Sequence, residues 1–422
     1  MENFNVYINA EDSPGVISAK LWLRGGSRAD PLSQKGAHQL LSSLLSRGCG
    51  PYSYERIGDL IEGCGACLNC ETYEDGNLIS LKCIENDVYD LLPILGWMVK
   101  DPHFKSKQIE LEKELTIQSL IRQKENPFYL AFDGWRKTVY GEGPYGHDPL
   151  GSIEDLKNID KNQLHLLSQT LNSREKIMVI TGSIPEKLPE ILSKLDPFNI
   201  ELNNQNVIEP VEMKRDSFNK EYRPEIRISL HPVDISQVVL MLGQPTIAES
   251  HKDALSLHLL STHLGCGMSS KLFLELREKH GVAYDVGVHH PVREGKSPFL
   301  LHASTSKEKS LHTLKLLREN WLKVLNNPIT EDELSLAKAK YRSQLAHGTQ
   351  TVSQKAERKA HLLGIQLSSQ HDKLNLEKVK DITPKDIHTT ANKYLNSPIL
   401  SLCGHIKYLE KLSKEWQIRS IY

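Results

Sequence analysis

The two halves of the chain present the same kinds of segment in the same order, and this repetition limits the folds open to the chain. Alternating apolar residues at 16–24 predict a strand, and a Gly- and Asp-containing loop and an apolar helix ending at Gly48 follow. Two further strands, 66–72 and 77–84, are joined by a Tyr-Glu-Asp-Gly turn typical of hairpins. From residue 238 onward a strand, two helices, two strands and two long helices recur. Ordered duplication of this kind predicts two homologous domains.

Chain length and a polar stretch indicate where the domains divide. The chain has 422 residues, which is too many for one ordinary hydrophobic core. Residues 203–224 are polar, carry two prolines and lack apolar periodicity. We therefore expect a domain at 1–205, a linker at 206–222 and a second domain at 223–422. The fold class expected for each is α+β, a mostly antiparallel sheet with helices packed on one face.

Composition excludes several classes of partner and compartment. Apolar residues make up 39% of the chain and charged residues 25%, and the net charge of −1 indicates neither a nucleic acid nor a membrane as partner. The cysteines number seven, an odd count that favours free thiols in a reducing compartment. The first ten residues do not resemble a secretory signal, and no apolar run is long enough to span a bilayer. These observations predict a cytoplasmic protein.

Three cysteines, Cys64, Cys67 and Cys70, have the spacing of an iron–sulfur ligand run. The same residues overlap the strand predicted at 66–72. Because Cys67 and Cys70 would point to opposite faces of that strand, they could not share a cluster. We therefore expect these thiols to be free.

Four segments together resemble one family of proteins. They are Gly-Ser-Arg-Ala-Asp at 26–30, Lys-Gly-Ala-His at 35–38, Tyr-Gly-His-Asp-Pro-Leu-Gly at 145–151, and the stretch from Gly267 to Tyr284. In these segments the chain resembles the pitrilysin, insulinase and mitochondrial-processing-peptidase family of zinc metallopeptidases, the inverzincins. The resemblance extends over essentially the whole sequence. It implies a two-domain member of that family.

The metal motif of the family, His-x-x-Glu-His on a helix, is degenerate in this chain. The resemblance places His38 at the first histidine, Leu41 at the glutamate, Ser42 at the second histidine, and Ser119 at the later glutamate ligand. One histidine cannot hold a catalytic zinc ion, for which three protein ligands are usual, and Leu41 cannot act as a base. The resemblance therefore implies no catalytic residue and no metal in this chain. We interpret His38 as a hydrogen-bonded histidine on a half-buried helix.

The substrate-binding pair of the family is intact. The resemblance places its arginine at Arg277 and its tyrosine at Tyr284. An arginine is a fixed cation with several donors and suits peptide carbonyls, whereas a tyrosine hydroxyl can donate to the oxyanion that forms when water attacks. Without the resemblance, the two residues would be interpreted as an arginine on a solvated helix end and a tyrosine at the start of a strand.

These expectations combine into one functional hypothesis and one alternative. The hypothesis is a non-catalytic subunit, inactive alone, of a heterodimeric zinc endopeptidase that acts on unfolded peptides. A homologous partner would supply His-x-x-Glu-His and Zn²⁺, and self-association of this chain alone stays open. The alternative is a structural or peptide-binding subunit without a proteolytic role. A hydrolase with its own nucleophile ranks last, because the sequence has no Gly-x-Ser-x-Gly elbow.

Overall fold

Strand β2, Val16–Arg24, forms where the alternating pattern predicts it and lies at the centre of a five-stranded sheet. The strand order is β1-β7-β2-β6-β5, with β1 at Phe4–Ala10, β7 at Lys176–Gly182, β6 at Gly76–Ile84 and β5 at Cys67–Thr72. Strand β1 pairs parallel with β7, and every other neighbouring pair is antiparallel. The last strand of the first half is thus inserted between the first two.

A second sheet repeats this arrangement strand for strand. Its order is β8-β12-β9-β11-β10, with β8 at Ile228–Pro232, β12 at Ile399–Gly404, β9 at Gln237–Pro245, β11 at Pro298–Ser306 and β10 at Asp285–His289. Strands β8 and β12 are parallel and the others antiparallel, as in the first sheet. The predicted duplication and the α+β fold class are therefore confirmed.

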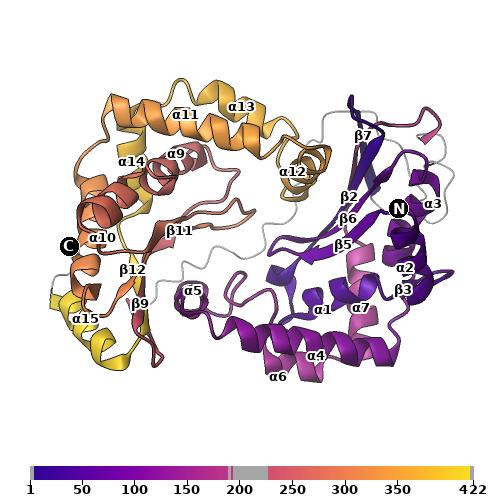
Figure 1. Ribbon diagram of the computed structural model, residues 1–422, viewed down its shortest axis with the longest axis horizontal. Coiled ribbons are helices and arrows are strands. Elements are labelled where there is room, and N and C mark those ends of the chain that lie inside the picture. The colour runs from indigo at the N-terminus through magenta and orange to yellow at the C-terminus, as the bar shows by residue number, and fades with distance from the viewer. Residues whose placement is uncertain (1–3, 189–191, 193–226, 419–422) are drawn as a thin grey trace. The chain divides into compact units, whose positions relative to one another are not determined.

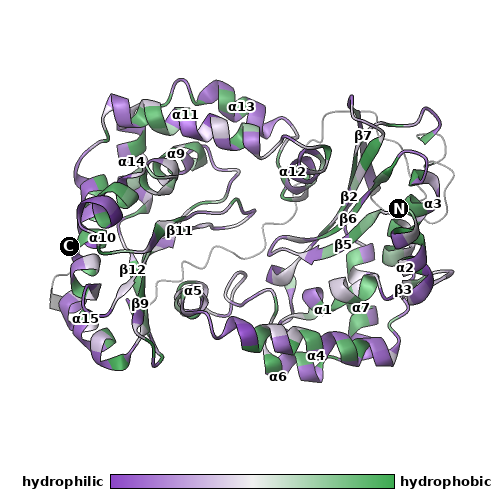
Figure 2. Cartoon of the chain, in the orientation of Figure 1, coloured by the Kyte–Doolittle hydropathy of each residue, from purple (hydrophilic) through white to green (hydrophobic). Residues whose placement is uncertain are grey.

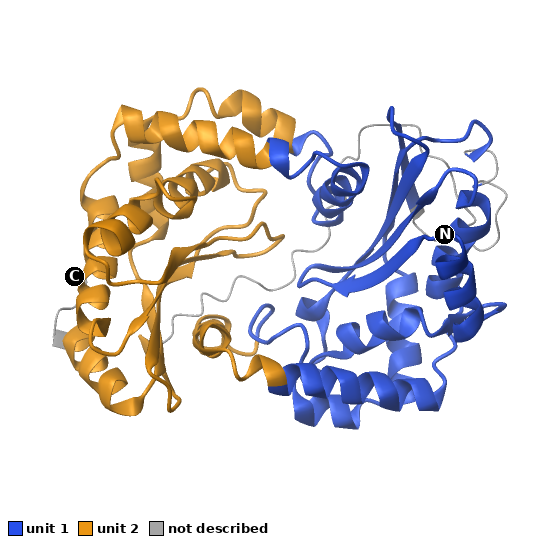
Figure 3. Cartoon of the chain, in the orientation of Figure 1, with its two compact units in different colours: residues 1–121, 143–212, 346–371 blue, residues 122–142, 213–345, 372–422 orange. Residues whose placement is uncertain are grey.

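The computed structural model describes residues 4–188, 192 and 227–418 (Figure 1), so the linker predicted at 206–222 lies outside the described residues. The chain divides into two compact units (Figure 3). Unit 1 comprises 1–121, 143–212 and 346–371, and unit 2 comprises 122–142, 213–345 and 372–422. The boundaries predicted near 205 and 223 stay predictions. Each unit, however, contains a piece of chain from the opposite half.

Helices occupy most of the remaining chain. In the first half they are α1 (Ala37–Leu45), α2 (Tyr54–Gly63), α3 (Val88–Lys100), α4 (Ser106–Gln123), α5 (Pro127–Tyr140), α6 (Ile153–Asn158) and α7 (Lys161–Asn172), with a 3₁₀ turn η1 (Ser27–Ala29) and a small ribbon of β3 (Gly48–Cys49) and β4 (Tyr52–Ser53). In the second half they are α9 (Ala254–Gly265), the π-helical turn η2 (Phe273–Lys279), α10 (Ser310–Asn326), α11 (Glu331–His347), α12 (Val352–Gly364), α13 (His371–Lys378), α14 (Pro384–Tyr394) and α15 (Ile406–Ile418). No helix within the described ranges is long and apolar enough to cross a bilayer.

Both faces of the first sheet are covered. On β2, Ile17 and Leu21 belong to the large core that also contains residues of α1, α3 and α7. The alternate residues Lys20 and Trp22 are also buried, and they lie on the face against which α12 packs. The sequence predicts helices on only one face of the first sheet, whereas in the structure α12 packs against the other face as well.

The helix that covers this second face comes from the opposite half of the chain, and the two halves do this reciprocally. Helix α12 belongs to unit 1 and contacts β2 and β7, whereas α5 belongs to unit 2 and contacts β8, β9 and β12 (Figure 3). Helix α5 directly follows α4, a long helix after the β5–β6 hairpin of the first half. Helix α12 directly follows α11, a long helix after the β10–β11 hairpin of the second half. Helices α5 and α12 are therefore counterparts in the duplication, and each completes the sheet of the other half.

The contact of α5 with its sheet is apolar. Its side chains share a buried cluster with strand residues, and the cluster consists of Ala131, Trp135, Val139, Val239, Met241, Leu300, Ile399 and Cys403. Trp135 is fully buried, and its Nε1 donates to the carbonyl oxygen of Gly243 over 3.2 Å. Burying a large apolar side chain contributes about 1.5–3 kcal/mol to stability. Because this contribution does not come from charges, the contact of α5 with its sheet should depend little on salt.

The contact of α12 includes charged side chains besides its buried residues Ala356, Ala360 and Leu363, and Figure 2 colours much of this helix as hydrophilic. The buried Lys20 Nζ lies 2.8 Å from Glu357 Oε2 and 3.0 Å from Ser80 Oγ. Two further contacts tie α12 to β1 and the segment after it, Lys359 Nζ donating to Asn9 Oδ1 over 2.7 Å and Lys355 paired with Glu11. Trp22 adds an aromatic contact with His361, with ring centroids 5.2 Å apart.

We expect the two exchanged helices to respond differently to salt. Partly exposed ion pairs contribute only about 0.2–1 kcal/mol each and are screened by ions. Raising NaCl from about 0.05 to about 0.5 M should therefore accelerate amide hydrogen exchange in α12 by about 2- to 5-fold, and leave α5 unchanged. Glu357→Gln, which keeps a hydrogen-bond acceptor for Lys20 without the charge, should reduce the response of α12. An equal response of both helices would contradict the prediction.

Candidate functional site

Helix α1 carries three of the four positions predicted for the degenerate metal site. It begins after Gly36, whose φ of 95° is left-handed and suits glycine. It ends at Leu45, one turn earlier than the stop predicted at Gly48. Gly48 lies instead in β3 with a φ of 120°, because Ser46 already closes the last turn.

The two residues that the resemblance places at the base and the second histidine are buried. Leu41 is 1% exposed and belongs to the large apolar cluster under the first sheet. Ser42 is also 1% exposed, and its hydroxyl has no hydrogen-bond partner in the structure. A water molecule that attacks a peptide would need space and a base here, and this helix face provides neither.

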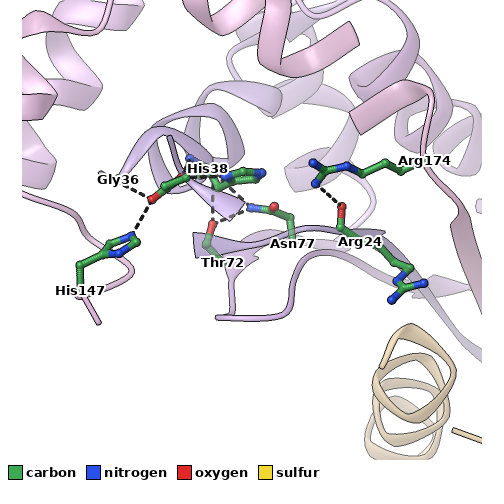
Figure 4. A network of polar contacts seen from close by, with 8 residues as sticks. Arg24, Gly36, His38, Thr72, Asn77, His147 and Arg174 are labelled. Atoms are coloured by element: carbon green, nitrogen blue, oxygen red, sulfur yellow. Dashed lines mark hydrogen bonds and ion pairs between the residues drawn. The ribbon is translucent and has the colours of Figure 1, made fainter. Parts of the chain in front are cut away.

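The remaining histidine, His38, is fully buried and bound to an aspartate (Figure 4). Its Nδ1 lies 2.7 Å from Asp30 Oδ1, and its backbone N–H donates to the same oxygen over 3.0 Å. The other oxygen of Asp30 accepts from the backbone of Gly36 over 2.7 Å and lies 3.0 Å from Nε2 of His147. We call this set of contacts the Asp30 network. It joins the start of α1 to the loop that resembles the family at 145–151.

The Asp30 network fixes the charge of its carboxyl group. Burial raises the pKa of Asp30, but the hydrogen bonds from His147 and His38 outweigh burial and hold this pKa below its ordinary value. Since Nδ1 of His38 contacts Asp30, only Nε2 remains for a metal, and it has no partner. It faces Gly25, where an added Cβ would lie 3.2 Å from it. The interpretation of His38 as a hydrogen-bonded helix residue agrees with this geometry.

The fourth predicted position, Ser119, lies on α4. Its hydroxyl donates to the carbonyl oxygen of Leu115 one turn earlier, over 3.0 Å. Glu112, two turns before Ser119, is buried and lies 2.7 Å from Nε of Arg47. Glu112 therefore neutralises Arg47, which lies next to α1. Glu114, also on α4, is exposed.

The residues present do not fit a catalytic zinc ion. A tetrahedral site of this type needs three protein ligands, and His38, Leu41, Ser42 and Ser119 offer one imidazole nitrogen. Within the described residues, no group of three or more His, Cys, Asp or Glu side chains is arranged to hold a metal. On β5, Cys67 is exposed and Cys70 is partly buried, in the alternating pattern expected of a strand.

The second half contains a counterpart of the Asp30–His38 pair that the sequence did not reveal. On α9, which corresponds to α1, Nε2 of His258 lies 2.6 Å from Oε2 of the buried Glu249. The ring of His290 packs beside His258 with centroids 4.9 Å apart, and burial lowers the pKa of His290 to about 3. A carboxylate before the helix and a histidine in its first turns are the signal that could have identified this pair.

The predicted substrate-binding pair lies in unit 2, and its two residues are in contact. Arg277 is exposed, and its Nη1 donates to the backbone oxygen of Tyr284 over 3.3 Å. The guanidinium carbon lies 5.0 Å from the centre of the Phe273 ring. The Tyr284 side chain is 70% exposed. Both side chains are therefore accessible to a ligand.

The turn that carries Arg277 is a π-helix, where the sequence predicts the end of an ordinary helix. The backbone N–H of His280 donates to Glu275, five residues earlier, over 3.2 Å. Such turns are uncommon and occur frequently at functional sites. Gly281, with a φ of 58°, then turns the chain into β10, so that Arg277 reaches the backbone oxygen of Tyr284.

Comparison with family models finds two matches that follow each other along the chain. Residues 6–150 match "Insulinase (Peptidase family M16)", and residues 177–341 match "Peptidase M16 inactive domain". Together they include all the site residues considered above.

Relatives and solved structures match over nearly the full length. An "uncharacterized zinc protease" of Rickettsia bellii is 23% identical over 95% of this chain and 97% of its own length. The "uncharacterized zinc protease YmxG" of Bacillus subtilis is 21% identical, covering 84% of each chain. Among structures, a peptidase M16 inactive domain from Pseudomonas fluorescens superposes with a TM-score of 0.80 at 22% identity, covering 95% of both chains. A protease from Helicobacter pylori gives 0.79 at 19% identity, covering 93% of this chain and 95% of that one. At these identities the structures show a shared fold.

Removing the charge at the centre of the Asp30 network should destabilise unit 1. Asp30→Asn loses hydrogen bonds to a carboxylate, so we expect about 2–3 kcal/mol less unfolding free energy at pH 7 in urea titrations. Asp59→Asn, at an exposed position of α2, serves as the control. Because the folded pKa of Asp30 lies below the unfolded value of about 3.9, its contribution is present above pH ~4 and lost on further acidification. The gap between wild type and Asp30→Asn should therefore narrow below pH ~4, and a constant gap would contradict this assignment.

Proposed function

Because the chain belongs to the insulinase family of peptidases, peptidase family M16, we propose that it is a subunit without its own catalytic zinc that completes the active site of a homologous partner. In this proposal the partner carries His-x-x-Glu-His and the zinc ion, which would activate water. This chain contributes Arg277 and Tyr284, and its substrate is an unfolded peptide. We place the complex in the cytoplasm. The relatives named zinc proteases lend the proposal its peptidase chemistry.

One contrast within the chain supports the proposal most directly. Leu41, which the resemblance places at the catalytic base, is packed in a hydrophobic core. In the same chain Arg277 and Tyr284 are exposed and in mutual contact. If the chain had lost its function entirely, there would be no reason to retain an exposed, ordered arginine–tyrosine pair. A function in trans gives such a reason.

The roles of the pair follow from their donors. The guanidinium of Arg277 can donate to peptide carbonyl oxygens and so fix the substrate backbone. The hydroxyl of Tyr284 can donate to the oxyanion that develops at the scissile carbonyl. Such a donor acts mainly in the transition state, so its removal should lower kcat more than it raises KM.

The proposal predicts activity only in a mixed complex, and dependence on both residues. The chain is co-expressed with a homologue from the same genome that carries His-x-x-Glu-His, and cleavage of a quenched fluorescent peptide library is measured. Tyr284→Phe should reduce kcat by about 10²-fold, the typical cost of one oxyanion donor, and Arg277→Ala should reduce kcat/KM. Lys279→Ala, an exposed change in the same π-helical turn, should leave the rate unchanged.

Two results of this experiment would decide against the proposal. If the complex cleaves peptides and both variants retain the full rate, the pair has no catalytic role. If the complex forms and binds peptides without cleaving any, the chain is a structural or peptide-binding subunit.

The isolated chain should be indifferent to zinc. A ligand that binds the folded state raises stability by RT ln(1 + [L]/Kd), so a true site would raise the Tm with added zinc and lower it with EDTA. We expect no change in either direction, and less than one zinc per chain by atomic absorption after dialysis. Adding EDTA to the mixed complex should abolish cleavage. Tight binding of one zinc per isolated chain that is lost in His38→Ala would overturn the assignment of a degenerate site.

A further inference from the structure

Arg277 is exposed, yet its guanidinium group has a defined place. The guanidinium carbon lies 5.0 Å from the centre of the Phe273 ring, and Nη1 lies 3.3 Å from the carbonyl oxygen of Tyr284. An exposed arginine side chain normally samples many rotamers, and this freedom is lost when a ligand orders it. Two contacts on different sides of the group reduce that loss in advance.

The kind of contact matters for what the arginine can still do. A guanidinium has five N–H donors, and a bidentate carboxylate partner would occupy two of them. Stacking on an aromatic face occupies none, because the attraction is between the cation and the ring's π electrons. Two acids near Arg277 have other partners, since Glu275 Oε2 lies 3.3 Å from Nζ of Lys279 and Asp285 Oδ2 lies 3.4 Å from Nδ1 of His302. Phe273 therefore orients Arg277 without competing for the donors that would bind a peptide.

Both contacts of Arg277 are themselves anchored in the fold. Phe273 begins the π-helical turn directly after Leu272, and Leu272 and Leu276 are buried in the core of unit 2. The backbone N–H of Tyr284 donates to the oxygen of Ser304 on β11 over 2.9 Å. The segments that carry the ring and the carbonyl oxygen are thus held by the core and by β11, as a pre-organised site requires.

We propose that Phe273 is a positioning residue for Arg277, holding its guanidinium group so that the unoccupied N–H donors are directed to a peptide backbone. The inference rests on the proposed function for its catalytic part. Its geometric part concerns this chain alone. The two parts are tested by different measurements.

The geometric part is tested by NMR on the isolated chain labelled with ¹⁵N-arginine. The Phe273 ring should displace the Arg277 Nε–H proton signal upfield, and Arg277→Lys assigns that signal by removing it. Phe273→Leu keeps an apolar side chain but removes the ring, so the displacement should vanish. Phe273→Tyr keeps the ring and should keep the displacement. If Phe273→Leu leaves the signal where it is, the stacking does not exist in solution and the inference is wrong, whatever the activity.

The catalytic part is tested in the complex with the zinc-bearing homologue. A cation–π contact at an exposed site contributes about 0.5–1 kcal/mol, so Phe273→Leu should lower kcat/KM by about 2- to 5-fold, and Phe273→Tyr should restore it. In the Arg277→Ala background Phe273→Leu should have no further effect, since the group it positions is gone. A loss that Phe273→Tyr does not restore, or one that persists in Arg277→Ala, would show a merely structural role and overturn the inference.

The outcomes separate the inference from the function on which it rests. If Arg277→Ala itself retains full activity, the proposed function fails, and the NMR signal still decides whether Phe273 orients Arg277. If Arg277→Ala loses activity but Phe273→Leu does not, the proposed function stands and the positioning role is wrong.

Discussion

Each five-stranded β-sheet in this protein has buried side chains on both faces, and the way in which the two faces are covered determines the rest of the fold. One face of each sheet buries helices of its own half, as the alternation on β2 and β9 requires. The other face of each sheet must also be covered, since it carries a fully buried side chain, Trp22 in the first sheet and Met241 in the second. A single helix from the opposite half covers that second face in each unit. The segments that carry the site residues, α1 and η2, are held by the cores that result.

Much of this fold could be predicted from the sequence, and the exception is instructive. The strands were predictable because alternating residues such as Ile17, Ala19 and Leu21 reveal a strand with one apolar face. The exchange of α5 and α12 was not, because periodicity shows which side of a helix is apolar but not which sheet it contacts. Trp135, which contacts Gly243 more than a hundred residues away, is a long-range contact of this kind. The π-helical turn at Arg277 was likewise not predictable, because its apolar residues Leu272 and Leu276 have the spacing of an ordinary helix.

The sequence proposes which residues form the candidate site, but it does not reveal their environment. The resemblance proposes His38, Leu41 and Ser42 as the degenerate positions, and the structure shows contacts that can hold their helix without a metal. Leu41 contributes to the core, and Asp30 holds His38 through contacts that do not involve a metal. The pair Glu249 and His258 repeats this arrangement in the other half. A carboxylate–histidine pair at the start of this helix therefore recurs in both halves, and it gives His38 a structural role that needs no metal.

The reciprocal exchange of helices also has a consequence for how the chain is made. A ribosome releases the first half of this chain long before it reaches Val352, so all five strands of the first sheet are available while the helix that covers Trp22 does not yet exist. During that interval the first sheet has one bare face, and α5 is already made but has no sheet to cover. Neither domain can therefore finish folding while the other is missing. Separating the halves by proteolysis or by expression as fragments would leave each with an uncovered sheet and an unpaired helix, the surfaces through which unfinished proteins aggregate.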